Sequence, residues 1–109
     1  MASPREEIAN RIAAFIRQEN LCNPYGGDVT LSADRRSRSV AFSKPANLDG
    51  HVDIYSPNFI LISYRTRYHG LPHTDRRIFA TEKDAVEFLR LAFVEYKFDE
   101  ALDIPTKGK

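Results

Sequence analysis

The stretch from Thr74 to Tyr96 constrains the fold most, because a strand pattern in it is followed at once by a helix pattern. It opens with charged residues that give way to Ile78 and Phe79, which is typical of a strand of about five residues. Thr81 and Asp84 follow with the spacing of a capping box and predict a helix N-terminus. Apolar residues then recur at three- and four-residue spacing, at Ala85, Phe88, Leu89, Ala92, Phe93 and Tyr96. A lone helix of this length is marginal in water, so its apolar stripe needs a cover, and the natural cover is the preceding sheet.

A second helix is predicted near the N-terminus, from about Pro4 to Asn20. Ser3 stands at the cap position, Pro4 at the first helical position and Glu6 where it completes a capping box. Ile8, Ile12, Phe15 and Ile16 then follow helical spacing. The segment 23–28 contains a proline and two glycines and ends this helix.

Between the helices the apolar period falls to two, which predicts strands. Residues 29–32 and 39–43 form a hairpin, residues 51–55 a third strand, residues 59–67 the longest strand and residues 74–80 the last, with loops at 44–50 and 69–73. The apolar run Phe59 to Ile62 has no polar face and predicts a strand end covered on both sides. Short connections favour an antiparallel meander. The predicted fold is α+β: an N-terminal helix, an antiparallel sheet of about five short strands, and a C-terminal amphipathic helix packed on the sheet.

The chain of 109 residues, 42% of them hydrophobic, is long enough for one core without metals or disulfides. We expect a single domain over residues 1–98 and a mobile C-terminal tail over 99–109, where the periodicity is lost. Cys22 is the single cysteine, which fits a reducing compartment. The longest apolar run, Ile12 to Ile16, has five residues, against the roughly 20 that cross a bilayer. With no signal-peptide pattern either, a cytoplasmic protein without a membrane span is expected.

The net charge of +1 conceals a division along the chain. Residues 1–34 carry a net charge of −2, residues 35–77 carry +5, and residues 78–109 carry −2. The predicted helices are therefore acidic and the predicted sheet is basic. Ordinary surface charge is the alternative explanation.

Candidate catalytic and metal-binding residues are few. His69, His73 and Asp75 have suitable ligand chemistry, but a Gly/Pro loop carries the two histidines and gives them no rigid frame. His51 and Asp53 share one face of a predicted strand and could form an oriented base, yet the sequence specifies no nucleophile beside them.

Two further patterns also give catalysis little support. Cys22 is expected to be a small buried residue at a helix C-terminus, where a thiolate is disfavoured. Gly26 and Gly27 lack the Lys-Ser/Thr of a phosphate loop. We therefore expect a protein that is not an enzyme and needs no metal or cofactor, with a metal-dependent enzyme as the least favoured reading.

The stronger signal is a set of arginines and a tyrosine on the predicted sheet. Guanidinium groups form paired hydrogen bonds with carboxylate and phosphate and also stack on flat rings. These residues are predicted to bind a partner, and they are Arg35, Arg36, Arg38, Arg65, Arg67, Tyr68, Arg76 and Arg77. The competing interpretation pairs the strand arginines with glutamates of the acidic helices, which needs no partner.

Residues 59–96 also resemble the three-strand-plus-helix DNA-binding modules of integrase arm-binding and AP2-type domains. The resemblance depends on the basic hairpin and on Phe79-Ala80-Thr81-x-x-Asp84-Ala85, which opens the helix. In those families the sheet enters the major groove, so the resemblance implies DNA binding through the sheet. The aromatic-rich first strand of those families is not matched closely, and the N-terminal helix and first hairpin lie outside the resemblance.

Two functions from different classes follow from the basic sheet. A binding module of the adaptor, inhibitor or immunity type would use arginine and tyrosine as anchors on an acidic protein surface. A nucleic-acid-binding domain would use the same sheet and hairpin on phosphates. The segregated charge favours nucleic acid, whereas the small net charge favours a protein partner, which we place first.

Overall fold

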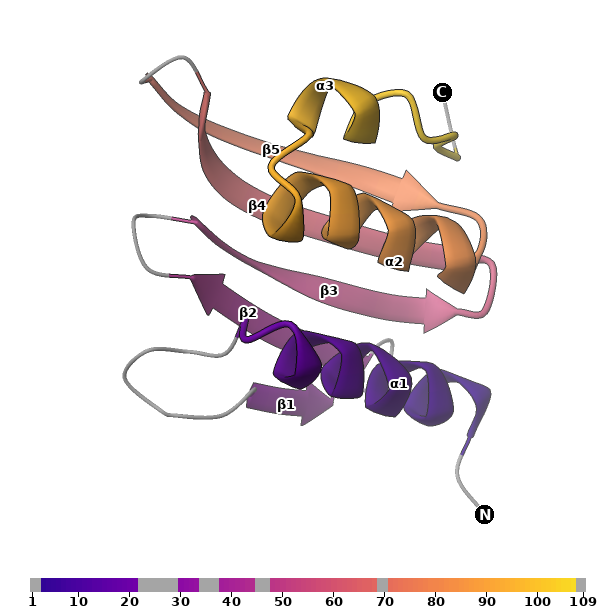
Figure 1. Cartoon of the computed structure of the whole chain (residues 1–109). Coiled ribbons are helices and arrows are strands. Elements are labelled where there is room, and N and C mark those ends of the chain that lie inside the picture. The colour runs from indigo at the N-terminus through magenta and orange to yellow at the C-terminus, as the bar shows by residue number, and fades with distance from the viewer. Residues whose placement is uncertain (1–2, 22–29, 34–37, 45–47, 69–70, 108–109) are drawn as a thin grey trace.

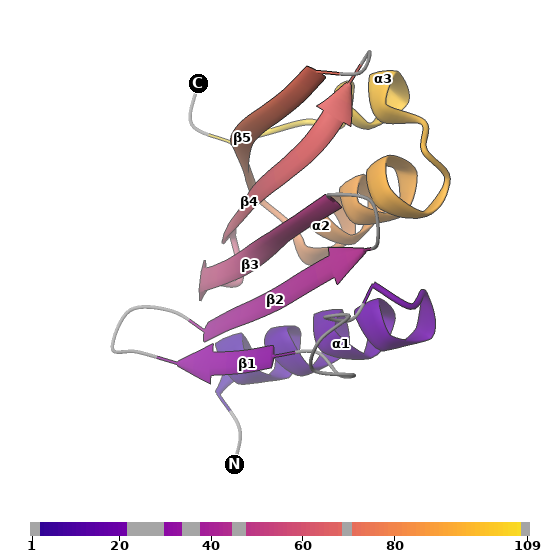
Figure 2. The same cartoon turned by 90° about the vertical axis from the view of Figure 1, so that its left-hand side faces the viewer.

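A five-stranded antiparallel sheet carries the described helices on one of its faces (Figure 1, Figure 2). The computed structural model describes residues 3–21, 30–33, 38–44, 48–68 and 71–107, with side chains except at 30–33, 43–44, 48–49, 66–68 and 71–73. Helix α1 precedes the sheet, and α2 and α3 follow it. The α+β class and the helix–sheet–helix order are therefore confirmed.

The strands follow one another across the sheet in chain order, β1 to β5, so the predicted antiparallel meander is confirmed. Their bounds are β1 Thr30–Ala33, β2 Arg38–Lys44, β3 Leu48–Ser56, β4 Phe59–Tyr68 and β5 Leu71–Phe79. Four strands have seven to ten residues, and β1 is a four-residue edge strand. They are longer than predicted because ladder pairing continues into the expected loops, from Ser43↔Asp49 to Lys44↔Leu48 and from Thr66↔His73 to Tyr68↔Leu71.

Helix α1 (Pro4–Gln18) begins as its sequence predicts. The amide of Glu6 donates to the Ser3 hydroxyl at 3.2 Å, and Pro4 occupies the first turn, where no amide hydrogen is needed. Ile8, Ile12 and Ile16 are buried along one stripe. This stripe fixes the helix against the sheet.

The second predicted helix is interrupted. Helix α2 (Glu82–Leu89) is capped by the Thr81 hydroxyl, which accepts from the Asp84 amide at 3.1 Å. A π-helical turn, η1 (Arg90–Val94), follows, in which the Glu95 amide donates to the Arg90 carbonyl at 2.9 Å. Tyr96 then adopts a left-handed φ of 58° and turns the chain into α3 (Phe98–Ala101). The predicted apolar stripe therefore ends at Phe93, because Tyr96 lies beyond the π-helical turn and is 62% exposed.

The core lies between the helices and one sheet face. The predicted stripe of Phe88, Leu89, Ala92 and Phe93 is confirmed, since all four are at most 5% exposed. The Phe88 ring lies 5.3 Å from that of Tyr64, 5.2 Å from that of Phe79 and 6.2 Å from that of Phe93. Such tilted and edge-on pairs are favourable beyond their buried area.

The segment predicted as a mobile tail is packed over its described part. Ala101 is fully buried, and Ile104 packs against the core. The Lys107 amide donates to the Ile78 carbonyl of β5 at 2.7 Å, and its Nζ donates to the Asn58 carbonyl at 2.9 Å. The packed core therefore continues beyond residue 98, through contacts that leave no periodic pattern in a sequence.

Helix cover is one-sided along β4, which corrects the prediction for Phe59 to Ile62. Ile60 and Ile62 are fully buried beneath the helices, whereas Phe59 and Leu61 point to the other face and are only partly buried. Apolar residues at Phe59 and Leu61 are compatible with that second face because neighbouring side chains and Lys107 cover part of it. Among the described residues, no helix has the length and apolarity needed to cross a bilayer.

Candidate functional site: the open face of the sheet

Strand alternation separates a helix-covered face from an open face. Side chains of residues paired directly across a sheet lie on the same face, so the register assigns each position. Ile60, Ile62 and Tyr64 mark the covered face. The open-face residues with described side chains include Ser39, Ala41, His51, Asp53, Tyr55, Phe59, Leu61, Ser63, Arg65, Thr74, Arg76 and Ile78. Figure 2 views the sheet nearly along its edge, with the helices on one side of it.

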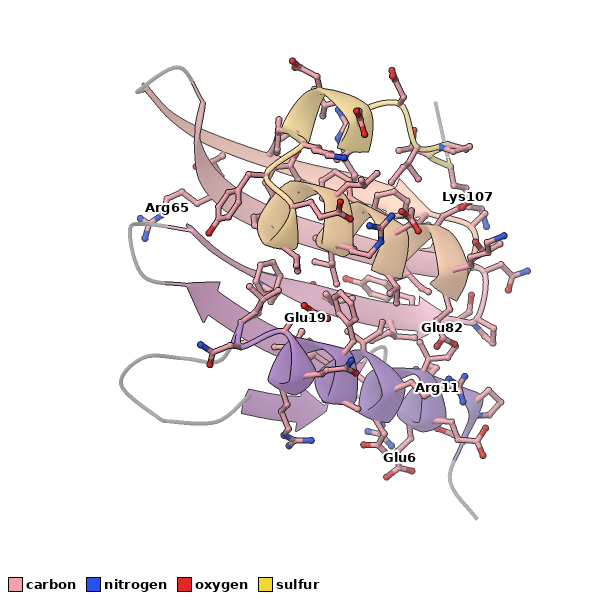
Figure 3. All side chains as sticks on the ribbon, in the orientation of Figure 1. Glu6, Arg11, Glu19, Arg65, Glu82 and Lys107 are labelled. Atoms are coloured by element: carbon pink, nitrogen blue, oxygen red, sulfur yellow. The ribbon has the colours of Figure 1, made fainter. Side chains whose placement is uncertain are left out.

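Arg65 and Arg76 of the predicted set lie on this open face. Arg65 pairs with Thr74 and Arg76 with Ser63, so the two arginines are diagonal neighbours on β4 and β5. Both are exposed, and Arg65 points away from α2 in Figure 3. Diagonal neighbours are about 7–8 Å apart, which is within reach of long side chains. The open face thus brings two cations together.

Arg77, another residue of the predicted set, does not share the open face with Arg65 and Arg76. It pairs with Ile62 and lies on the covered face, where its Nε donates to the Tyr64 hydroxyl at 3.3 Å. Its guanidinium also lies 6.0 Å from the centre of the Phe88 ring. Arg38 pairs with Ile54 and lies on the covered face too. One residue of offset along a strand reverses the face, so Arg76 and Arg77 have opposite environments.

The other predicted residues cannot be assigned to either surface. Arg35 and Arg36 lie outside the described residues, as do Cys22, Gly26, Gly27 and His69. The side chains of Arg67, Tyr68 and His73 also lie outside the described part, although their backbones belong to β4 and β5.

Three glutamates that could have neutralised the strand arginines are paired within the helical layer. Arg11 of α1 donates to both carboxylate oxygens of Glu82 on α2, at 2.8 and 2.7 Å. Figure 3 shows these two side chains meeting. Glu87 and Glu95 both form ion pairs with Arg90. These carboxylates therefore do not account for the arginines of the open face.

His51 and Asp53 lie together on the open face, as their spacing predicts. His51 Nε2 is 3.2 Å from Asp53 Oδ2, and the Ser39 hydroxyl donates to the other carboxylate oxygen. The Asp53 side chain is 14% exposed and that of His51 51%. The structure therefore places the Ser39 hydroxyl beside the His51–Asp53 pair, a neighbour that the sequence did not specify. The cluster satisfies Asp53 within the sheet and leaves His51 at the surface.

Asp75 is engaged by local contacts. One carboxylate oxygen accepts from the Arg76 amide at 2.8 Å, and the other accepts from the Tyr64 hydroxyl at 3.4 Å. Burial raises the pKa of Tyr64, and the hydrogen bond from Arg77 opposes this shift. In the part of the chain that the structure describes, no three potential metal ligands gather.

A groove of about 1000 Å³ borders the open face at the end of β4 and β5. Its apolar lining comes from Tyr55, Phe59, Leu61, Ile78 and Leu102, and its charged lining from Asp75, Arg76, Arg77 and Lys107. The rings of Tyr55 and Phe59 meet edge-on at 5.4 Å, and Lys107 Nζ lies 5.5 Å from the centre of the Phe59 ring. The sequence analysis did not predict this groove. The run Phe59 to Ile62 nevertheless places apolar side chains on both faces of one strand, which was a usable signal.

The groove therefore combines an aromatic and aliphatic floor with Asp75, Arg76 and Arg77 of β5 and with Lys107 of the C-terminal segment. Comparison with protein-family models, curated proteins and solved structures gives no match for this chain.

Proposed function

We propose that the protein is a non-enzymatic binding module whose open sheet face takes an acidic surface of a protein partner. The observation that carries this proposal is the charge of that face. Among the side chains that the structure describes on this face, the exposed charges are Arg65 and Arg76, while Asp53 is largely buried and bonded to Ser39 and His51. The register also places Asp49 on this face, opposite Arg65. The positive charge of Arg65 and Arg76 makes the open face complementary to carboxylates.

Two features favour a protein partner over nucleic acid. The net charge of the whole chain is only +1, which is small for a protein that must neutralise several phosphates. The same face has an apolar groove floored by Phe59, Leu61 and Ile78, and half-buried apolar surface beside arginine is typical of protein interfaces.

One observation supports nucleic acid as the second candidate. Tyr55 is 38% exposed and is braced edge-on by Phe59, on the face that carries Arg76. An exposed ring beside a guanidinium can stack a base and hold its phosphate. This candidate uses single-stranded nucleic acid, because stacking requires unpaired bases.

The test is charge reversal on the open face. The variants Arg65→Glu and Arg76→Glu, singly and together, are compared with Lys83→Glu, which makes the same charge change as either single variant at an exposed position on α2. Binding to fluorescein-labelled polyglutamate and to labelled oligothymidylate is followed by anisotropy at several salt concentrations.

We expect polyglutamate to bind the parent protein and Lys83→Glu equally, and to bind the double variant at least about tenfold more weakly. The melting temperature should change little. Binding of oligothymidylate alone would move the second candidate ahead. A clear drop in melting temperature without any binding defect would show that the two arginines are structural, and would overturn the proposal.

A further inference from the structure

We propose that the partner supplies an extended acidic segment that pairs with the outer edge of β5 as an added strand. This inference rests on the proposed function and specifies its binding mode. Strand addition combines backbone hydrogen bonds along a sheet edge with pockets for alternate side chains. Both requirements can be examined at β5.

The outward-pointing groups of β5 are identified by their hydrogen bonds. The Ile78 carbonyl accepts from the Lys107 amide, and the Arg76 amide donates to the Asp75 carboxylate, so neither group is used in pairing with β4. Amide and carbonyl of one residue point to the same side of an antiparallel strand, and the side alternates. The backbone groups of Thr74, Arg76 and Ile78 therefore face away from β4.

Pro72 agrees with this assignment. Pro72 lies two residues before Thr74 in β5, so its backbone nitrogen faces the same side as that of Thr74, and proline has no amide hydrogen there. Proline within a sheet is confined to positions where the amide side faces away from a neighbouring strand. The edge residues of β5 thus offer their groups outward without loss of any bond to β4.

The C-terminal segment already makes one strand-like contact at this edge. Lys107 covers the Ile78 carbonyl only, and no described residue bonds the outward amide or carbonyl of Thr74. β5 has nine residues, which is long for an edge strand. Proteins normally protect such edges with short strands, charges or proline. Here the protection consists of Pro72 and the charged pair Asp75 and Arg76, which leaves room for a selected partner strand.

The groove beside this edge meets the second requirement. A strand paired with residues 74–76 would direct alternate side chains toward Leu61 and Ile78 on the open face. Arg76 lies along that path, Lys107 lies at its end, and Arg77 lines the same groove. The Asp75 carboxylate also lines it and accepts from the Arg76 amide and the Tyr64 hydroxyl. Apolar residues alternating with carboxylates would therefore fill the floor and pair with Arg76 and Lys107. Nucleic acid has no peptide backbone that could pair with a strand, so this mode requires a protein partner.

The probe is a fluorescein-labelled peptide of about seven residues that alternates glutamate and valine. A second peptide of the same sequence is N-methylated at the glutamates, and a third at the valines. N-methylation removes amide donors but keeps the charge. The amides of a strand alternate in direction, so those that face β5 belong either to all the glutamates or to all the valines. One of the two N-methylated peptides therefore blocks them, whichever register the peptide adopts.

The matching protein variant is Thr74→Pro, which removes one outward amide hydrogen and leaves the pairing with β4 intact. Thr74→Val is its control, because it changes the side chain and keeps the amide. We expect the parent peptide to bind, one N-methylated peptide and Thr74→Pro each to weaken binding about tenfold or more, and Thr74→Val to have little effect. The Thr74 amide should also exchange more slowly when the peptide is bound.

Each contrary result has a defined meaning. Equal binding of all three peptides, with binding still lost in the Arg65/Arg76 reversal, overturns strand addition and leaves the proposed function standing. If neither this peptide nor polyglutamate binds, both proposals fall. If Thr74→Pro does not fold, the peptide comparison on the parent protein decides the question by itself.

Discussion

Gly50 on β3 lies directly against Phe42 on β2 and Tyr64 on β4. The register pairs Gly50 with both residues, and all three positions lie on the helix-covered face. A Cβ at position 50 would be 2.8 Å from Phe42 Cζ and 2.9 Å from the Tyr64 Cα. It would also be 2.3 Å from the Ser63 carbonyl oxygen. The large rings on either side fit into the core because this one position has no side chain.

The variant Gly50→Ala should therefore destabilise the fold. Overpacking a filled core costs about 1–3 kcal/mol, because neighbouring backbone must move to admit the methyl group. The midpoint of urea unfolding measures the effect, and Ala41→Ser, a change of similar size on the open face, serves as the control. An unchanged midpoint in Gly50→Ala would show that the packing of β3 is looser than described.

Phe88→Ala should be more damaging still. Phe88 is fully buried and contacts the rings of Tyr64, Phe79 and Phe93, so truncation removes apolar area and leaves a cavity among them. The expected loss is about 3–5 kcal/mol in the free energy of unfolding. Val86→Ala, at a partly buried position of the same helix, should lose much less. Equal losses in the two variants would contradict the placement of the α2 stripe.

Stability should fall at alkaline pH because of Tyr64. Burial raises the pKa of Tyr64 above its ordinary value of 10.0. The folded state then holds the phenol proton more tightly than the unfolded state, so the stabilisation is complete below pH 10 and is lost as pH rises toward the higher folded value.

The comparison is with Tyr64→Phe, which removes the titrating group and keeps the ring. Unfolding by urea is measured at neutral pH and above pH 10 for both proteins. The parent should lose more stability over this interval than the variant. Parallel losses in both would mean that Tyr64 titrates with an ordinary pKa.

The C-terminal segment should contribute to stability. Ala101 is fully buried, so Ala101→Asp would place an unpaired charge in the core and should cost at least about 2 kcal/mol. Glu100→Asp, at the exposed neighbouring position, is the matched control. If Ala101→Asp unfolds at the same urea concentration as the parent, residues 98–107 do not pack as described.

The ion pair between Arg11 and Glu82 should contribute little, and only at low salt. Its two hydrogen bonds connect α1 to α2, and the carboxylate of Glu82 raises the pKa of Arg11, but the Arg11 side chain is 57% exposed. Exposed pairs are weakened by solvent and by screening. A double-mutant cycle of Arg11→Ala and Glu82→Ala should give a coupling that disappears in high salt. A coupling that persists there would indicate a less exposed contact.

Local chemistry was readable from the sequence. Ser3, Pro4 and Glu6 set the start of α1, and Thr81 sets the start of α2, because each cap involves residues within one turn. The stripe through Phe88 and Phe93 could be predicted for the same reason. The meander also followed, since short connections leave neighbouring strands few other arrangements.

Tertiary structure alone decided which arginines share a surface. Arg76 and Arg77 are adjacent in a segment without alternating apolar residues, so nothing local distinguishes their directions. Pairing of Arg77 with Ile62 turns Arg77 into the covered face and Arg76 onto the open face. The side-chain period of a strand is two, so one residue of register decides this outcome for the whole segment.

The groove and the packed C-terminal segment likewise depended on contacts distant in the chain. Lys107 meets Ile78 and Asn58, and Ala101 joins a core built mainly by residues before it. A single hydrogen bond or a buried methyl group leaves no periodic signal in a sequence. The sequence by itself therefore determined α1, the start and stripe of α2, the sheet and the basic character of residues 35–77. The tertiary structure decided which of those charges lie on the open face, because only strand register distributes them between the two faces of the sheet.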